Sequence, residues 1–271
     1  MIDEGHAVRA VRAKLDRTLA HLEHLDGEYG PWTDRHPYSI VKQAQPKPQV
    51  WEYGIRFTEP VPVEWGVILG EAIHNLRSAL DHCVYLLTVA RLGRKPNYKT
   101  GLPIYKTERE FIDKGGQRQI AELTNTAQTY IKTLQPYPRR DARLNRDLLS
   151  LNMLWNQDKH RLVEPWGLKF ISDSLRELIV IPPYKRIRIS DAVLHDDAKA
   201  FTLWFDADPG QVNVSGYLAF QIAFEDPAER QAPKDRELRS LHRSSVEIVD
   251  HLLSLLPEHH AARPLRSTVK G

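Results

Sequence analysis

The stretch Glu64–Leu92, EWGVILGEAIHNLRSALDHCVYLLTVARL, is the longest uninterrupted helical pattern in the chain. At about 100° per residue, its apolar side is formed by Leu69, Ile73, Leu76, Leu80, Cys83, Val84 and Leu87. Its polar side is formed by Glu71, His74, Asn75, Ser78, Asp81, His82 and Tyr85, with Arg77 at the edge. A face that meets only water is usually rich in Lys and Glu, which favour helices, whereas His, Asn, Ser and Asp favour them less. We therefore expect this polar side to be the functional site.

Hydrophobic periodicity and turn residues predict the elements around this helix. Helices are expected at 5–27, 107–113, 117–134, 142–160 and 236–256, the first ended by Gly27, Gly30 and Pro31 and the fourth followed by Pro165. A hairpin is expected from 38–43 and 49–58 around the turn at 45–48, and three or four antiparallel strands are expected within 175–226.

These elements indicate an α+β fold: a predominantly helical bundle of about five helices with an antiparallel β hairpin and sheet layer. The first and last helices each need a surface to cover, so we expect a single domain over 1–271. Its parts are an N-terminal helix and hairpin (1–62), a helical core (63–165), a β layer (170–226) and a C-terminal helix (235–257).

The composition is that of an ordinary globular protein, with 271 residues, 41% hydrophobic and 27% charged residues, and a net charge of +3. One cysteine excludes an intramolecular disulfide, and Cys83 is expected in the core. No run of 18 apolar residues and no signal-peptide pattern occurs, so we expect a cytoplasmic protein that does not contact membranes. Phosphate-binding loops and the common zinc and serine-hydrolase motifs do not occur either, and no cofactor is expected.

A second polar segment ends the helix predicted at 142–160, and we expect it to share a site with the polar side of the long helix. The binding residues expected in this site are Glu71, His74, Asn75, Ser78, Lys159 and Arg161, and the catalytic ones are Arg77, Asp81, His82, Asp158 and His160. An arginine can hold a scissile phosphate, and a histidine can take the proton from an RNA 2′-hydroxyl. Asp81 or Asp158 would orient the imidazole of His82. The chemistry indicated is metal-independent RNA cleavage.

The sequence Arg77-Ser-Ala-Leu-Asp-His82 resembles the motif of the HEPN superfamily, in which four to six residues separate an arginine from a histidine. Many members of that superfamily are metal-independent endoribonucleases of toxin–antitoxin, abortive-infection and CRISPR systems. The resemblance implies RNA as the partner and a homodimer that pairs two motifs. It departs from the pattern at Ser78, where Asn, Asp or His is usual.

The blocks HNLRSALDH, LQPY and NQDKHR also resemble a family of uncharacterised bacterial and phage-associated proteins, many of them actinobacterial. This resemblance covers roughly residues 60–165. It implies that the LRSALDH and DKHR blocks form one site, but no activity.

Two alternatives remain open. Asn75, Ser78, His82 and Asn156 could satisfy one another in a buried structural network, with Arg77 and Asp81 paired at i, i+4. The protein would then be a non-catalytic scaffold that binds a partner. The candidate surface is a basic–aromatic cluster of the β layer, formed by Tyr184, Lys185, Arg186 and Arg188. Less favoured is a metal-dependent hydrolase centred on His74, Asp81 and His160, since the second Glu-x-x-His helix of metal-binding bundles does not occur.

Overall fold

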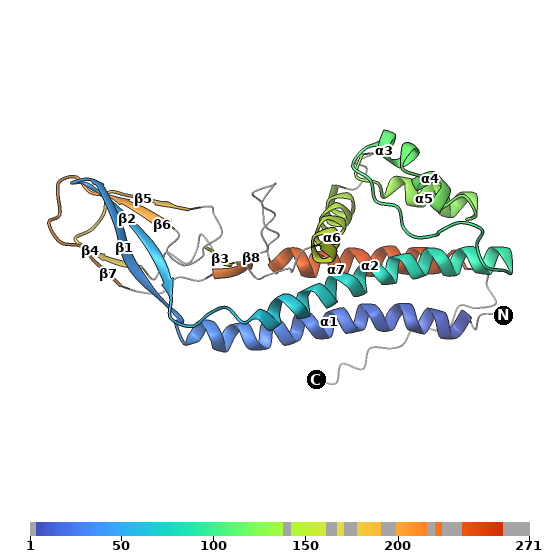
Figure 1. The fold of residues 1–271 in the computed structure, drawn as a ribbon, viewed down its shortest axis with the longest axis horizontal. Helices are drawn as coiled ribbons and strands as arrows, with labels where there is room; N and C mark the ends of the chain where they lie inside the picture. The colour runs from blue at the N-terminus through green and yellow to red at the C-terminus, as the bar shows by residue number, and fades with distance from the viewer. Residues whose placement is uncertain are drawn as a thin grey trace. The chain divides into compact units, whose positions relative to one another are not determined.

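The computed structural model describes residues 4–137, 142–160, 167–170, 178–190, 199–215, 220–223 and 235–256. Within these ranges the chain forms an α+β fold with seven helices and an antiparallel sheet (Figure 1). The helices are α1 (Glu4–Asp34), α2 (Val63–Leu92), α3 (Glu108–Asp113), α4 (Gly116–Gln119), α5 (Asn125–Thr133), α6 (Ala142–His160) and α7 (Asp235–Leu253). The strands are β1 (Tyr38–Lys47), β2 (Val50–Phe57), β3 (Gly167–Phe170), β4 (Ile179–Ile181), β5 (Arg186–Ile189), β6 (Lys199–Trp204), β7 (Asn213–Ser215) and β8 (Phe220–Ala223).

The chain divides into two compact units. The first contains residues 1–21, 71–156 and 239–271, and the second contains residues 22–70 and 157–238. The expectation of a single domain stays a prediction, and each unit has its own core.

The first unit is helical. Its buried apolar residues come from α1, α2, α3, α5, α6 and α7 and from the connections between helices. They include Leu15, Leu80, Cys83, Ile131, Leu148, Leu241 and Ile248. Helix α2 begins and ends close to the predicted residues, and Gly93 ends it with a φ of 63° and an amide that donates to the Val89 carbonyl at 2.9 Å. Cys83 is completely buried, as expected, and its burial raises the pKa of the thiol to about 12.

The second unit is built on the four-stranded sheet, in the order β1-β2-β6-β5 (Figure 1). The predicted hairpin is confirmed as β1 and β2, but β1 continues to Lys47, so the turn lies at 48–49 and not at the predicted 45–48. One face of the sheet carries Trp51, Tyr53, Ile55, Phe201 and Leu203, which pack with Leu25 and Trp32 of α1 and Trp65 of α2 in one apolar cluster. Two further pairs, β3–β8 and β4–β7, are also antiparallel.

Two predicted helices were wrong in extent. Helix α1 continues seven residues past Gly27 to Asp34, with Pro31 inside it. Burying the Trp32 side chain contributes about 4–6 kcal/mol, which is comparable with the cost of two helical glycines at about 1 kcal/mol each and a proline at about 3 kcal/mol. Leu25 is buried in the same cluster, and Tyr29 packs against it. Tertiary packing therefore decides where α1 ends.

The helix predicted at 117–134 is instead two helices, α4 and α5. Thr124 separates them, because its backbone is extended and its hydroxyl accepts a hydrogen bond from the Ala127 amide at 3.3 Å. This side chain begins a new helix at Asn125. Ile120 and Leu123, which the periodicity placed on a helix, are buried in the connection.

Candidate functional site

Arg77 and Asp81 form the centre of the polar side of α2. One turn separates them, and the guanidinium makes a forked pair with the carboxylate: Nε donates to Oδ2 at 3.2 Å, and Nη2 lies 2.9 Å from Oδ1. The side chain of Arg77 is only 9% exposed and that of Asp81 is 28% exposed. Burial lowers the pKa of Arg77 from its ordinary value, and the charge of Asp81 opposes this shift.

The same two side chains hold the irregular segment that follows α2. Arg77 Nη2 donates to the Leu102 carbonyl at 2.6 Å, and the Leu102 amide donates to Asp81 Oδ1 at 2.8 Å. Both backbone polar groups of Leu102 are therefore satisfied by side chains of α2, in a segment that has no helix or strand to satisfy them. The approach is close: a Cβ atom added at Gly101 would lie 2.9 Å from Asp81 Oδ1.

The other nitrogen of the guanidinium has a different environment. The Trp155 ring of α6 faces Arg77, with 5.0 Å between Cζ and the ring centroid. Within the described part of the chain, Nη1 is buried and makes no hydrogen bond. A buried donor of this kind costs about 1–3 kcal/mol, and the contact with the aromatic face offsets part of that cost.

His82 and His74 lie on the solvent side of α2. Both are exposed, whereas Ser78 and Asn75 are half-buried. Partial burial lowers the pKa of His82, and the positive charge of Lys14 and the nearby His74 lower it further, while Asp81 raises it. The net effect favours the neutral form of the His82 imidazole. Within the described ranges, the hydrogen bonds of this side of α2 come from Arg77 and Asp81, not from Asn75, Ser78 or Asn156.

Glu71 has a separate environment from the other polar residues of α2. Its carboxylate is 56% exposed, and it lies 3.3 Å from the buried imidazole of His21 in α1. This contact joins α1 to α2 within the helical unit. The Glu71 carboxylate, which the sequence analysis expected to bind a ligand, is therefore engaged in a contact between helices.

The second predicted segment approaches α2 through Asp158. In the second unit, a Cβ atom added at Gly70 would lie 2.5 Å from the Asp158 carboxylate, so this side chain packs against the α2 backbone. Lys159 and His160 are in α6, but their side chains lie outside the described part of the structure, as does the whole of Arg161. Their predicted roles stay predictions.

A metal site was the less favoured alternative. Among the described side chains, no group of three or more His, Cys, Asp and Glu residues is arranged to hold a metal ion. The carboxylate of Asp81 is already engaged by Arg77 and by the Leu102 amide. No helix in the described ranges is long and apolar enough to cross a membrane.

The sequence did not reveal that other polar side chains act in the same way as Arg77. Gln135 is completely buried, donates to the Pro103 carbonyl at 2.7 Å and accepts from the Tyr105 amide at 3.1 Å. Asn145 donates to the Gln135 carbonyl at 2.7 Å, and Arg91 donates to the Leu123 carbonyl at 2.5 Å. Polar side chains on helices or just beyond their ends therefore repeatedly satisfy irregular backbone in this unit.

A buried carboxylate that the sequence analysis also missed joins α6 to α7. Asp147 Oδ2 accepts hydrogen bonds from the hydroxyls of Ser240 at 2.7 Å and Ser244 at 2.6 Å. Arg143 donates to Ser244 Oγ at 2.7 Å and to Glu247 at 2.6 Å. The i, i+4, i+7 spacing of Ser240, Ser244 and Glu247 beside the apolar stripe of α7 was the available signal.

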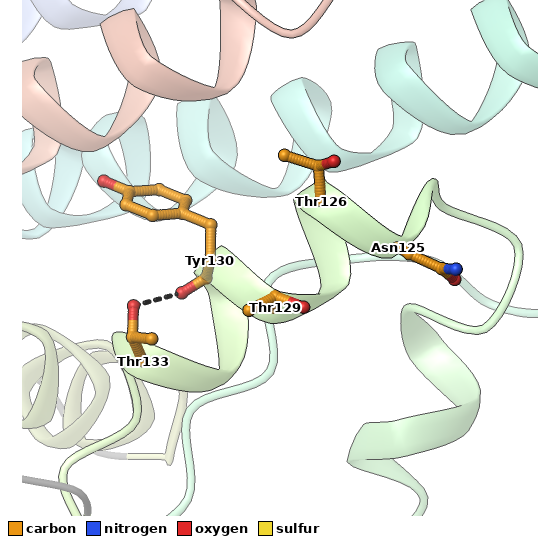
Figure 2. Close-up of a pocket in the computed structure, with 5 residues that line it drawn as sticks. All are labelled: Asn125, Thr126, Thr129, Tyr130 and Thr133. Atoms are coloured by element: carbon orange, nitrogen blue, oxygen red, sulfur yellow. Dashed lines mark hydrogen bonds between the residues drawn. The ribbon is translucent and has the colours of Figure 1, made fainter.

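A pocket of about 550 Å³ lies along α5 (Figure 2). It is lined by Asn125, Thr126, Thr129, Tyr130 and Thr133, and the Thr133 hydroxyl donates to the Tyr130 carbonyl at 2.7 Å. The Tyr130 ring lies 3.8 Å from that of His251, between centroids. The five lining residues include no ionisable group other than the Tyr130 phenol, so the pocket offers little to an acid–base reaction.

Comparisons of the chain with protein-family models, with curated proteins and with solved structures found no match. The resemblances carried by the LRSALDH and DKHR blocks therefore stay predictions. The function has to be argued from the geometry alone.

Proposed function

We propose that this protein is a non-catalytic binding protein in which the polar side of α2 is a structural network. One observation carries the proposal: Arg77 and Asp81 together satisfy the amide and the carbonyl of Leu102. Arg77 is the expected phosphate clamp of a ribonuclease and Asp81 a residue expected to orient His82, and both are engaged in holding the backbone.

The cost of releasing Arg77 supports this proposal. A phosphate clamp must present its guanidinium to the substrate, but the Arg77 side chain is 9% exposed and its Nη1 atom is buried. Breaking a buried ion pair by removing one partner costs about 3–5 kcal/mol. An RNA phosphate would have to offset a cost of this order and also displace the segment at Leu102.

The recurrence of the same contact supports it further. Gln135, Asn145 and Arg91 also donate to carbonyl groups of irregular segments, and none of them belongs to a motif for catalysis. A helical unit that uses its polar residues in this way is suited to be a rigid scaffold. Binding would then take place elsewhere on the molecule.

Metal-independent ribonuclease activity is the second candidate, and one observation favours it. His82 is exposed, its lowered pKa favours the neutral imidazole, and Asp81 lies beside it in the sequence. A neutral imidazole can act as a general base. In this candidate, a group other than the buried Arg77 would have to bind the phosphate.

The test is incubation of the wild-type protein, His82→Ala and His74→Ala with mixed RNA in the presence of EDTA, together with thermal melting of all three proteins. His74→Ala is the matched control, because it removes another exposed histidine from the same helix. We expect no cleavage by any of the three, and melting temperatures within about 2 °C of one another, because exposed side chains contribute little. Cleavage that survives EDTA, persists in His74→Ala and is lost in His82→Ala would overturn the proposal in favour of the ribonuclease.

A further inference from the structure

The sheet of the second unit has one face outside the apolar core. Residues paired directly across antiparallel strands lie on the same face. One row of such pairs runs from Lys47 to Val50, Trp204 and Arg186, and the next runs from Glu52 to Thr202 and Arg188. We call this face, with Arg56 and Lys199 in the neighbouring rows, the outer face. Its partner face carries Trp51, Tyr53, Phe201 and Leu203 in the core cluster.

Trp204 is the main apolar group of the outer face. It is only partly buried and is not a member of the core cluster, in contrast to Trp32, Trp51 and Trp65. Arg186, its cross-strand neighbour, places Cζ 5.2 Å from the Trp204 ring centroid. A planar cation therefore lies over an aromatic ring that is partly accessible to solvent.

The charge of the outer face is strongly unbalanced. Among the described residues of its strands, the cations are Lys47, Arg56, Arg186, Arg188 and Lys199, and the one carboxylate is Glu52, which pairs with Lys199 at 2.9 Å. This excess of positive charge on one sheet face exceeds the net charge of +3 carried by the whole chain. Of the neighbouring acids, Asp206 is paired with Lys185 at 2.7 Å.

The predicted basic–aromatic cluster at 184–188 is thus divided by the structure. Tyr184 packs against the core and Lys185 is paired, so neither contributes to the outer face. Arg186 and Arg188 do contribute, because they alternate with the inward-facing Ile187 and Ile189 along β5. The sheet adds Trp204 from β6, which the sequence analysis did not associate with them.

We infer that the outer face binds single-stranded nucleic acid. The inference rests on the proposed binding function and names its partner. Proteins that bind single strands combine cations that follow the phosphates with aromatic rings on which bases stack. In a duplex the base faces are stacked inside and cannot reach a ring. Arg186 and Arg188 would contact phosphates, and Trp204 would stack on a base. Because the Arg186 guanidinium lies beside the Trp204 ring, it can contact the phosphate of the same nucleotide whose base stacks on Trp204.

The experiment is a titration of fluorescent oligo(U) and oligo(dT), each of about 12 nucleotides, a length within the site sizes of single-strand binding folds. A duplex RNA of the same length is included, and all titrations are run in EDTA at several salt concentrations. The variants are Trp204→Leu, which keeps the apolar bulk without the aromatic face, Trp204→Phe, which keeps a ring, and Arg188→Ala. Tyr98→Ala and Arg109→Ala are matched controls, since Tyr98 is 51% exposed and Arg109 is 90% exposed, both outside the sheet. A melting curve for each variant verifies that it is folded.

We expect wild-type protein to bind the single strands, and Trp204→Leu to weaken binding by about tenfold, since one stacked base contributes about 1–3 kcal/mol. Trp204→Phe should restore most of the loss. Arg188→Ala should lower the slope of log K against log salt by about 0.7 for each phosphate contact removed. Both controls should bind as wild type does. A preference for oligo(U) or oligo(dT) would identify RNA or DNA as the ligand.

Three results would overturn the inference: no binding at low salt, equal binding by Trp204→Leu and wild type, or equal binding of duplex and single strands. Each would leave the proposed non-catalytic function intact. Cutting of oligo(U) in EDTA that His82→Ala abolishes would instead overturn the proposed function. Intact and cut strands separate on a gel, so the two failures are distinguishable in the same samples.

Discussion

The polar side of α2 and the outer face of the sheet contain similar residues but use them differently. On α2, Arg77 is buried and forked onto Asp81, and both side chains bind the backbone of Leu102. On the sheet, Arg186 and Arg188 are exposed, and Arg186 faces an aromatic ring that is outside the core. Residues whose types suggest catalysis in a sequence can use all of their polar groups in contacts that hold the fold together. A binding surface is better identified by cations that the fold leaves exposed.

The strongest way to break this comparison is Arg77→Ala. If the pair is structural, the variant leaves Asp81 without its partner and the Leu102 carbonyl without its donor. We expect the free energy of unfolding to fall by about 3 kcal/mol, the lower end of the range for broken buried pairs, because Asp81 is 28% exposed. Urea denaturation measures this loss.

Arg109→Ala is the control for that loss, because its i, i+4 pair with Asp113 is on the surface. It should change the free energy of unfolding by less than about 0.5 kcal/mol. A similarly small effect for Arg77→Ala would mean that the fork is dispensable, and Arg77 would again be available for a phosphate.

Two glycine substitutions test the contact between Asp81 and the Leu102 segment by steric effect alone, because each adds one methyl group to the chain. A methyl group at Gly101 would lie 2.9 Å from Asp81 Oδ1, the atom that accepts from the Leu102 amide. We expect Gly101→Ala to destabilise the fold by about 1 kcal/mol, the contribution of one weakened hydrogen bond.

Gly27 lies in α1 with nothing within 4 Å of an added Cβ atom. Gly27→Ala should therefore stabilise by about 0.5–1 kcal/mol. Thermal melting of both variants should give shifts of opposite sign, and a stabilised Gly101→Ala would contradict the tight contact.

The helices could be predicted from the sequence where local patterns decide them. Helix α2 and helix α6 occur within a residue or two of the expected ends, because their apolar stripes are long and Gly93 ends the first. Helix α1 could not be delimited, because its last turn depends on Trp32 packing with Trp65, at 5.5 Å between ring centroids and 33 residues away. The division at Thr124 was readable from a capping residue but conflicted with the periodicity.

The sites could be predicted only in part, for a related reason. The polar side of α2 was singled out by its residue types, but its partner, the backbone of Leu102, has no side-chain signature in the sequence. Likewise Arg186 and Arg188 stood out, but Trp204 joins them only because β5 pairs with β6 in a particular register. Periodicity gives the face of an element, whereas pairing between distant segments decides what that face meets.

The smallest expected effect concerns His82 on the polar side of α2 and appears in how stability depends on pH. Its pKa is lowered by partial burial, by Lys14 and by His74, against the opposing charge of Asp81. A lowered histidine pKa means that the unfolded chain binds the proton more readily than the folded chain. The contribution of His82 to stability is therefore fully present above about pH 6.5 and is lost as the pH falls through the folded pKa. His82→Gln should slightly reduce the loss of stability at acidic pH. In His74→Gln, the matched control, stability should still fall as the pH is lowered. The effect should be smaller than that of either glycine substitution because His82 is exposed. His242, whose pKa is also lowered by burial, contributes in the same direction and remains in both variants.

NMR titration of the His82 ring measures the pKa directly. A value above 6.5 would mean that Asp81 dominates its surroundings, so the carboxylate would not be fully used by Arg77 and Leu102, and the structural interpretation of α2 would lose its main support.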